Sequence, residues 1–369
     1  MGMMYITCSN VPIPIGVQKK IQAQTKVFDR YYGCAMFGYC HYGMMYLSKN
    51  GENIEKDFAV TDEEKFNLYL KWIKKYGVSK VFIRAKIPLN VFLLAFLREL
   101  KKLSIVVVYE IPSWPLDSLI KNPDVMFEEQ YNQVELKKYV SLVTTYININ
   151  EIYGIPVCTL QNGVDLETLP LRKRRERKKT ICLMMVALME PWQGLERLIE
   201  GMYDYCKHDG AYDIKFFFVG EGSGIPYWKK LVKELNLINN VKFYGQKIGR
   251  ELNELYDIVD MGIGCLGSYK LGFKQGASIK VREYCARGLP FIYGYDDIGF
   301  TGNEIFCKRV SNDSSPIDMH DIIELYEKTV ERQDIIDTMR DYASKHLTWD
   351  VILKPVLKYY DEACNLRMN

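Results

Sequence analysis

The chain has 369 residues, 48% hydrophobic and 13% aromatic, a composition that excludes disorder as its main state and can fill the cores of two domains. Its 49 basic and 46 acidic residues give a formal net charge of +3. This near balance argues against a dedicated nucleic-acid binder, whose affinity depends on neutralising many phosphates.

The first half of the sequence alternates strand and helix patterns. The apolar run Met4–Cys8 reads as a strand, and Val17, Ile21 and Phe28 then recur at helical spacing. The elements expected after them are a helix over 63–76, a strand over 80–83, a helix over 89–102 and a strand over 104–109. A continuous β-branched run such as 104–109 is typical of parallel strands covered on both faces, so the pattern predicts a doubly wound α/β domain.

The second half repeats this rhythm. Strands are expected over 181–186, 214–219, 241–244, 261–264 and 291–293, and helices over 195–207, 227–236, 250–259 and 279–286. We therefore predict an N-terminal domain over 1–170 and a C-terminal domain over 181–349.

Between the two halves lies Arg172–Lys179, a run too charged to be part of a core. We expect an interdomain linker over 171–180. The run could be a solvated face, or it could dock the protein peripherally on an anionic membrane surface.

Ten scattered cysteines form no CxxC pair, which is typical of buried thiols in a reducing compartment. The longest apolar stretch, Val91–Leu97, is far shorter than the roughly 20 residues that span a bilayer, and no signal peptide is recognisable. We expect a soluble, cytoplasmic protein that could work at the inner face of the membrane.

Four segments carry the most specific pattern. They are Gln161–Asp165, Val186–Leu195, Phe218–Gly224 and Gln275–Ile292. In them the sequence resembles the retaining glycosyltransferases of family 4, the glycosyl transferases group 1. The resemblance implies the GT-B architecture: two Rossmann-like domains facing across a cleft, the second binding a nucleotide-sugar. It also implies that a C-terminal helix, about 350–369, crosses back to the N-terminal domain.

The first two segments match the family unequally. Asn162-Gly163 reads as a turn, because both residue types tolerate positive φ. The loop Val186–Leu195 is similar to one that supplies an Arg and a Lys to the donor diphosphate, but Leu188 and Gln193 stand at those positions here. We expect other groups, including amides at a helix N-terminus near Gly194, to meet the diphosphate charge.

The third segment lacks the GxGxxG spacing of a dinucleotide site. The resemblance instead implies that Gly222 lies at the donor and that the base lies near Gln246 and Lys247.

The fourth segment has the strongest resemblance. Glu283 matches the glutamate that accepts hydrogen bonds from the ribose hydroxyls, a task that suits a carboxylate. Gln275 replaces a glutamate that contacts the transferred sugar. Lys280 is expected in the first turn of a helix beginning at Ile279, against the helix dipole, which indicates an anionic partner. We expect it to contact the diphosphate; the alternative is a solvated lysine paired with an acid.

In the first half, Gly16 resembles the glycine loop that approaches the donor or acceptor from the opposite wall. Glu110 follows the strand over 104–109, at a carboxyl end where α/β folds place ligands. It is expected either to steer the acceptor hydroxyl or to cap local amides. The pattern Glu110–Pro115 is similar to a subgroup of these transferases in bacterial surface-polysaccharide pathways.

No metal or other cofactor is expected. The four histidines show no ligand spacing, and Asp296-Asp297 reads as a pair of turn formers.

The sequence thus predicts a hexosyltransferase (EC 2.4) that moves a sugar from a UDP-sugar to a saccharide or lipid-linked oligosaccharide acceptor, with retention. Its catalytic residues would be Glu110, Gln275 and Lys280, with electrostatic stabilisation of the leaving diphosphate as the main effect. Two alternatives remain open: a nucleotide-sugar epimerase of the same fold, and a catalytically weak partner subunit.

Overall fold

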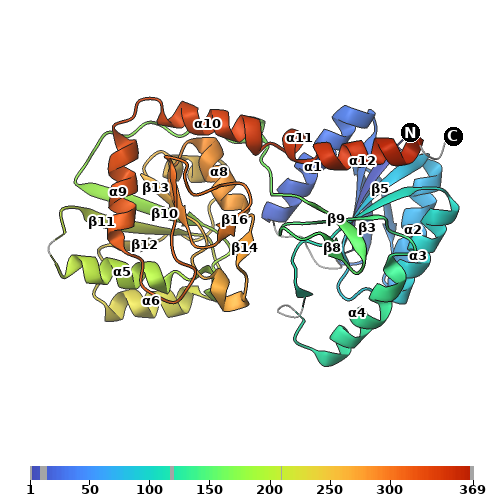
Figure 1. Ribbon diagram of the computed structural model, residues 1–369, viewed down its shortest axis with the longest axis horizontal. Coiled ribbons are helices and arrows are strands. Elements are labelled where there is room, and N and C mark those ends of the chain that lie inside the picture. Colours follow the sequence, from blue (N-terminus) through green and yellow to red (C-terminus); the bar gives the residue numbers. More distant parts are fainter. Residues whose placement is uncertain (1, 9–14, 117–119, 209, 366–369) are drawn as a thin grey trace. The chain divides into compact units, whose positions relative to one another are not determined.

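The computed structural model describes residues 2–8, 15–116, 120–208 and 210–365 (Figure 1). The chain forms two compact units. Unit 1 consists of Met1–Gln161 and Trp349–Asn369, and unit 2 of Asn162–Thr348. None of the helices in the described part of the chain is long and apolar enough to cross a membrane. All ten cysteines are free thiols.

Unit 1 is built on one nine-stranded sheet with the order β4-β3-β2-β1-β5-β6-β7-β9-β8. Its strands are β1 (Gly2–Thr7), β2 (Ala35–His41), β3 (Met44–Lys49), β4 (Glu52–Phe58), β5 (Val78–Arg84), β6 (Val106–Glu110), β7 (Leu142–Thr145), β8 (Glu151–Ile152) and β9 (Ile155–Thr159). The strands from β2 to β9 in this order pair in parallel, whereas β3, β4 and β8 are antiparallel additions at the two edges.

Helices cover both faces of this sheet. They are α1 (Ile15–Tyr32), α2 (Asp62–Lys75), α3 (Val91–Lys102), α4 (Pro123–Leu136), α11 (Trp349–Ile352) and α12 (Lys354–Asn365). Because side chains alternate along a strand, Met4 joins the core under α2 and α3, while Tyr5 packs its ring on Phe82, which in turn meets Phe28 of α1. Both faces are therefore buried, as the doubly wound prediction requires.

The antiparallel strands β2, β3 and β4 were not predicted from the sequence. They are joined by two tight turns in which both central residues have positive φ, Tyr42-Gly43 and Asn50-Gly51. Asn-Gly between alternating residues is a strong hairpin signal, so Asn50-Gly51 could have revealed this part of the sheet.

Unit 2 holds a six-stranded, wholly parallel sheet with the order β12-β11-β10-β13-β15-β17, and a separate two-stranded pair. The strands of the main sheet are β10 (Thr180–Val186), β11 (Asp213–Val219), β12 (Val241–Phe243), β13 (Met261–Ile263), β15 (Phe291–Tyr293) and β17 (Cys307–Arg309). The pair consists of β14 (Gln275–Gly276) and β16 (Asp296–Asp297).

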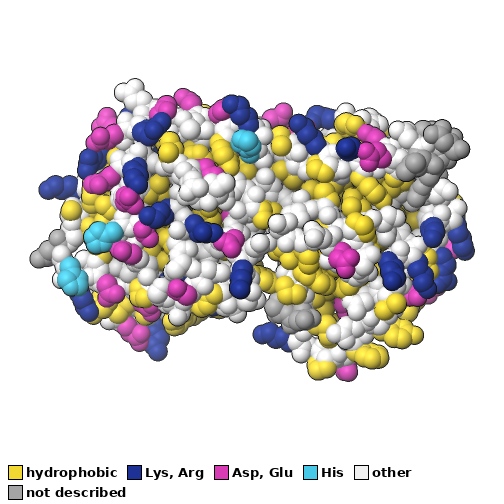
Figure 2. Space-filling model, in the orientation of Figure 1, with side chains coloured by type: hydrophobic (Ala, Val, Ile, Leu, Met, Phe, Trp, Pro, Cys, Tyr) yellow, Lys and Arg dark blue, Asp and Glu magenta, His cyan; other side chains and the backbone are white. Residues whose placement is uncertain are grey.

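The helices of unit 2 are α5 (Glu196–Cys206), α6 (Ile225–Glu234), α7 (Gly249–Tyr256), α8 (Ile279–Arg287), α9 (Met319–Val330) and α10 (Ile335–His346). They enclose two apolar clusters, one around Trp228 and Phe218 and the other around Tyr284 and Phe291. Lys, Arg, Asp and Glu side chains intermingle over α9 and α10 (Figure 2). Basic and acidic side chains are therefore mixed on that surface, as the small net charge of the whole chain would suggest.

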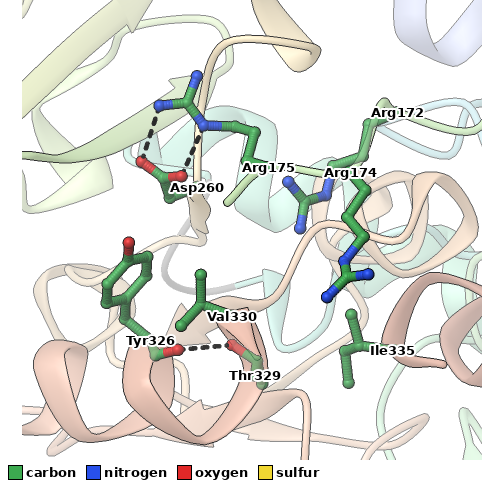
Figure 3. A pocket seen from close by; sticks show the side chains of 8 residues that line it. All are labelled: Arg172, Arg174, Arg175, Asp260, Tyr326, Thr329, Val330 and Ile335. Carbon is green, nitrogen blue, oxygen red and sulfur yellow. Dashed lines mark hydrogen bonds and ion pairs between the residues drawn. The ribbon is translucent and has the colours of Figure 1, made fainter. Parts of the chain in front are cut away.

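The basic run Arg172–Lys179 is not a linker between the units. The units meet at 161–162, and the run packs on unit 2: the Arg172 amide donates to Arg287 and its Nε to Gly288. Arg175 forms an ion pair with Asp260 at 2.6 Å, with which it lines a small pocket (Figure 3). The other lining residues are Arg172, Arg174, Tyr326, Thr329, Val330 and Ile335.

Acidic partners neutralise three of the seven cations that suggested a linker or a membrane-docking segment. Lys173 pairs with Asp257, and Arg177 pairs with Glu327 and Glu331. The sequence pattern did not reveal this, because the acids lie 80 or more residues further along the chain.

The expected turn at Asn162-Gly163 is also absent, since neither residue has a positive φ. The side-chain amide of Asn162 instead donates to the Ala277 carbonyl just before α8, and the backbone amide of Val164 donates to the Leu347 carbonyl at 2.8 Å. The two segments through which the chain enters and leaves unit 2 are therefore paired with each other.

Candidate functional site

The loops that leave the strands of the unit 2 sheet gather at one edge, because parallel strands end on the same side. The Leu266 amide, after β13, donates to Gln193, after β10, at 2.9 Å. The Gly220 amide, after β11, donates to Gly245, after β12, at 2.8 Å. The sequence candidates in this unit lie on these loops and on α8, which begins at the same edge.

Gly222 brings two of these loops into backbone contact. A Cβ placed at Gly222 would lie 2.5 Å from the carbonyl carbon and oxygen of Met189, and one at Gly220 would lie 1.9 Å from the Ala187 oxygen. The Met189 amide donates to Glu221 at 2.8 Å, which continues the pairing of β10 and β11 beyond the strands. The glycines are thus required by the approach of the two loops.

Gly194 has a similar structural reason. It adopts φ +70° at the end of the short helix Pro191–Gln193, and a Cβ there would lie 2.5 Å from the Gly267 nitrogen. Its own amide donates to Pro191 at 3.3 Å. Gly194 is buried and its own amide has a partner. That amides near Gly194 serve the diphosphate stays a prediction.

Lys280 and Gln193, 87 positions apart in the sequence, are in direct contact. Lys280 Nζ donates to Gln193 Oε1 at 2.6 Å, and Gln193 Nε2 donates to the Leu188 carbonyl at 3.0 Å. Lys280 lies in the first turn of α8, as predicted. Among the described residues no carboxylate forms an ion pair with it, so the alternative of a lysine neutralised by an acid is wrong. Burial lowers the pKa of Lys280 to about 8.

Glu283 follows Lys280 by three residues on α8, so the two side chains share one face of the helix. Glu283 is partly exposed, whereas its neighbours Arg282 and Tyr284 are buried. The carboxylate therefore points away from the core, which a ligand-binding role requires. Gln275, in β14, is also partly exposed and pairs in register with Asp296.

Gln246 and Lys247 lie after β12 at the same edge. Gln246 is exposed, and Lys247 forms an ion pair with Glu251 at 2.6 Å, one turn into α7. Leu188, where the family carries a cation, is 60% exposed. The structure thus brings Lys280 and Gln193 into contact, and it places Gln246 and Lys247 on a loop at the same edge of the sheet and Glu283 on the same helix as Lys280.

Asp296 and Asp297 are not simple turn formers. They form β16, Asp297 pairs with Arg282 through both carboxylate oxygens, and neither side chain of that pair is exposed to solvent. Asp296 pairs with Arg309. The sequence could not show that Arg282, two residues after Lys280, is committed to a buried pair.

Unit 1 has its own row of polar residues at the carboxyl ends of its parallel strands. Thr7, Arg84, Glu110 and Thr144 stand in register on β1, β5, β6 and β7. Residues in register on parallel strands face the same side of the sheet. Here that side is covered by α1, which contributes Lys20.

Glu110 is fully buried, and its carboxylate accepts hydrogen bonds from four side chains. Tyr5 Oη and Arg84 Nη1 donate to its Oε2 at 2.8 Å, Lys20 Nζ donates to Oε1 at 2.9 Å, and Tyr146 Oη donates to Oε1 as well. Burial alone would raise the pKa of Glu110, but Lys20 and Arg84 outweigh it and hold that pKa well below its usual range.

This arrangement corrects both interpretations of Glu110. The carboxylate neither reaches an acceptor hydroxyl nor caps local amides, because its oxygens are occupied by side chains from β1, α1 and β5 and from Tyr146, just after β7. Gly16 lies in the first turn of α1 with open space around its Cβ position, one helical turn before Lys20. The sequence had singled out Glu110 but not Arg84; the ends of the strands over 80–83 and 104–109 were the signal that could have paired them.

In the described part of the chain, no group of three or more His, Cys, Asp or Glu side chains is placed to hold a metal ion.

Comparison with known proteins points to one class of enzyme. Residues 170–301, all within unit 2, match the family model described as glycosyl transferases group 1. Among curated proteins none matches the sequence.

Solved structures share the fold over the whole chain. A glycosyltransferase from Rickettsia africae is similar with a TM-score of 0.67 at 17% identity, covering 98% of each chain. Anabaena HepE, crystallised with UDP, has a TM-score of 0.65 at 12% identity and covers 98% of this chain and 100% of its own. The lipopolysaccharide outer core galactosyltransferase WaaB has a TM-score of 0.63 at 13% identity and full coverage of both. These likenesses establish the α/β fold with two Rossmann-like units, the GT-B fold.

Proposed function

We propose that this chain, a glycosyltransferase whose residues 170–301 match the group 1 family model, transfers a hexose-type sugar from a UDP-sugar to a saccharide or lipid-linked oligosaccharide with retention of configuration. The UDP bound to HepE and the saccharide product implied by the name of WaaB support the choice of donor and acceptor. Retention is supported by the resemblance of Gln275–Ile292 to family 4. We place the reaction in the cytoplasm, at the inner membrane face when the acceptor is lipid-linked.

One observation carries the proposal: a partly buried cation lies at the edge where α/β folds bind ligands, and no carboxylate among the described residues pairs with it. Lys280 Nζ donates to the neutral Gln193 Oε1 at 2.6 Å. A cation held against both burial and the helix dipole indicates that an anion completes the site. Glu283, on the same helix face, would accept the hydrogen bonds of the ribose.

In the proposed reaction the bond from the anomeric carbon to the diphosphate oxygen breaks, the acceptor hydroxyl oxygen attacks from the same face, and the proton of that hydroxyl passes to the departing diphosphate. Negative charge grows on the leaving UDP, and a preorganised cation stabilises such charge most where water is excluded. Lys280 would do this, with Gln193 holding its ammonium group in place. Lys280 would thus replace the Arg and Lys that the family has at Leu188 and Gln193.

The first test is donor binding. UDP should raise the midpoint of thermal unfolding, because a ligand that binds the folded state stabilises it by mass action. Glu283→Ala should weaken UDP binding about 10- to 100-fold, since hydrogen bonds to a charged group contribute roughly 1.5–3 kcal/mol. Glu254→Ala is the matched control, because Glu254 is an exposed helix carboxylate of the same unit, paired only with Arg250.

Equal UDP affinity in the Glu283→Ala variant and the wild type would refute the site. If no nucleotide-sugar stabilises the protein, the catalytically weak partner subunit becomes the better account, as the exposed Leu188 would suggest. Turnover of donor without acceptor would indicate an epimerase. The proposed chemistry uses no metal, so added chelator should leave the transfer rate unchanged.

A further inference from the structure

The Glu110 cluster of unit 1 carries more positive than negative charge. Two cations, Lys20 and Arg84, face the single carboxylate of Glu110, with Tyr5 and Tyr146 as neutral donors. One positive charge therefore remains at the carboxyl edge of the sheet. Charges buried this deeply are normally paired one to one, so the excess needs an explanation.

The excess charge is accessible at Arg84. The side chain of Lys20 is 5% exposed and that of Glu110 is 0% exposed, whereas that of Arg84 is 20% exposed. Glu110 accepts a hydrogen bond from one of the guanidinium nitrogens, Nη1, and the Tyr5 hydroxyl is a second side-chain partner of Arg84 within the described ranges. Since a guanidinium has five N–H donors, a fork remains for a planar anion.

Further polar groups at this edge and on α1 have no hydrogen-bond partner among the residues that the structure describes. Thr7 is the register neighbour of Arg84 on β1, and Thr144 is the neighbour of Glu110 on β7. Within the described ranges their hydroxyls are buried without a partner, as are both side-chain amide atoms of Gln24, which is four residues beyond Lys20 on α1. Buried polar atoms usually have partners, so an incomplete set at a ligand-binding edge points to a missing ligand.

We propose that Arg84, held in place by Glu110, binds a phosphate or carboxylate group of the acceptor. The transferase would then act on an anionic saccharide. This inference rests on the proposed function for the reaction itself but on residues of the other unit, so the two can fail separately. Arg84 would be a specificity residue, and Glu110, Lys20 and Tyr5 would position it.

The test measures binding of glucose 6-phosphate, glucuronate and glucose to the full chain by calorimetry. The wild type should bind the two anionic sugars at least about tenfold more tightly than glucose, in line with a charge-assisted bidentate pair. Arg84→Gln should abolish this ratio, and Arg84→Lys should keep part of it, because a lysine retains charge without the fork. Lys86→Met is the control: Lys86 lies at the same edge but already pairs with Asp62 at 2.8 Å.

UDP binding distinguishes the sources of the anion. If Arg84 serves the acceptor, Arg84→Gln should bind UDP with wild-type affinity. Loss of UDP binding in that variant would assign Arg84 to the donor diphosphate and overturn the inference, as would equal affinity of the wild type for glucose and both anionic sugars. If the wild type binds anionic sugars but not UDP, the inference stands and the proposed donor fails. Arg84→Lys, which keeps the ion pair with Glu110, provides the test if Arg84→Gln does not fold.

Discussion

At the scale of single residues, Lys280 shows how a functional charge can be recognised. An ammonium group is costly to bury without an anion, and the lowered pKa of about 8 reports that cost. A group whose pKa is lower in the folded state makes folding less favourable while it is charged, so the protein should gain stability between pH 8 and 10.5 as Lys280 loses its proton.

The affinity for UDP should show the opposite dependence on pH. Above pH 8 the ammonium is lost, and Kd for UDP should rise by about tenfold per pH unit, because one protonated group is required. Calorimetric titration of the wild type between pH 7 and 9.5 checks this. Lys280→Met should bind weakly at every pH and should melt a few degrees higher than the wild type at pH 7 without ligand. A pH-independent Kd in the wild type would remove Lys280 from the donor site.

Glu110 is the opposite case. The sequence predicted a functional role for its charge, but in the structure its carboxylate binds and positions neighbouring side chains. Glu110→Gln leaves Lys20 and Arg84 buried without their anion, so the free energy of unfolding should fall by about 3–5 kcal/mol. Because the pKa of Glu110 is held far below its usual range, its stabilising effect is complete above the unfolded value and is lost only as the pH falls below about 4.3.

Urea unfolding at pH 7 measures this loss. Adding Lys20→Met to Glu110→Gln should recover part of the stability, because one of the two stranded cations is removed. A single Glu110→Gln variant as stable as the wild type would show that the cluster does not depend on this carboxylate.

At the scale of elements, the two faces of α8 have different roles. One face is buried: Tyr284 Oη donates to Ile263, and Arg282 pairs with Asp297 of β16. The other face carries Lys280 and Glu283. Gly288 ends the helix at φ +77°, and the chain enters β15 three residues later. The buried pair thus orients the helix that carries the two proposed donor-binding side chains.

Asp297→Asn should therefore disturb the site by loosening the position of α8, since Asp297 is not proposed to contact the ligand. Breaking a fully buried ion pair on one side costs about 3–5 kcal/mol, so the midpoint of urea unfolding should fall clearly. Replacing both partners, as in Arg282→Met with Asp297→Leu, should cost less because no charge is left unpaired. Chemical denaturation of the three proteins checks this, and a double variant less stable than Asp297→Asn would contradict it.

At the scale of the whole molecule, the core of unit 1 includes residues from α11 and α12, which follow unit 2 in the sequence. Trp349, Leu353, Val356 and Tyr360 of α11, α12 and the segment between them are buried, and Tyr360 Oη donates to the Val81 carbonyl in the sheet at 2.7 Å. A fully buried apolar side chain contributes about 1.5–3 kcal/mol, so losing four would remove much of the 5–15 kcal/mol by which a domain is stable.

A chain ending at Thr348 should therefore lose the folding of unit 1 and keep that of unit 2. Calorimetry should show one transition fewer than in the full chain, and UDP should still raise the remaining midpoint. Two unchanged transitions in the truncated chain would show that α11 and α12 do not complete the first core.

The sequence by itself determined the alternation of strands and helices, the second-unit sheet in outline, and Lys280, Gln193 and Glu283 as residues to examine, because these follow from local periodicity and short motifs. Only the tertiary structure decided which charges are free. Lys280 meets Gln193 from 87 positions away, and Arg282 is committed to Asp297. Three cations of the basic run are paired with distant acids, and Glu110 is surrounded by four side chains that are remote from it in the sequence. Whether a charge has a partner depends on contacts between remote segments, and no local pattern encodes those contacts.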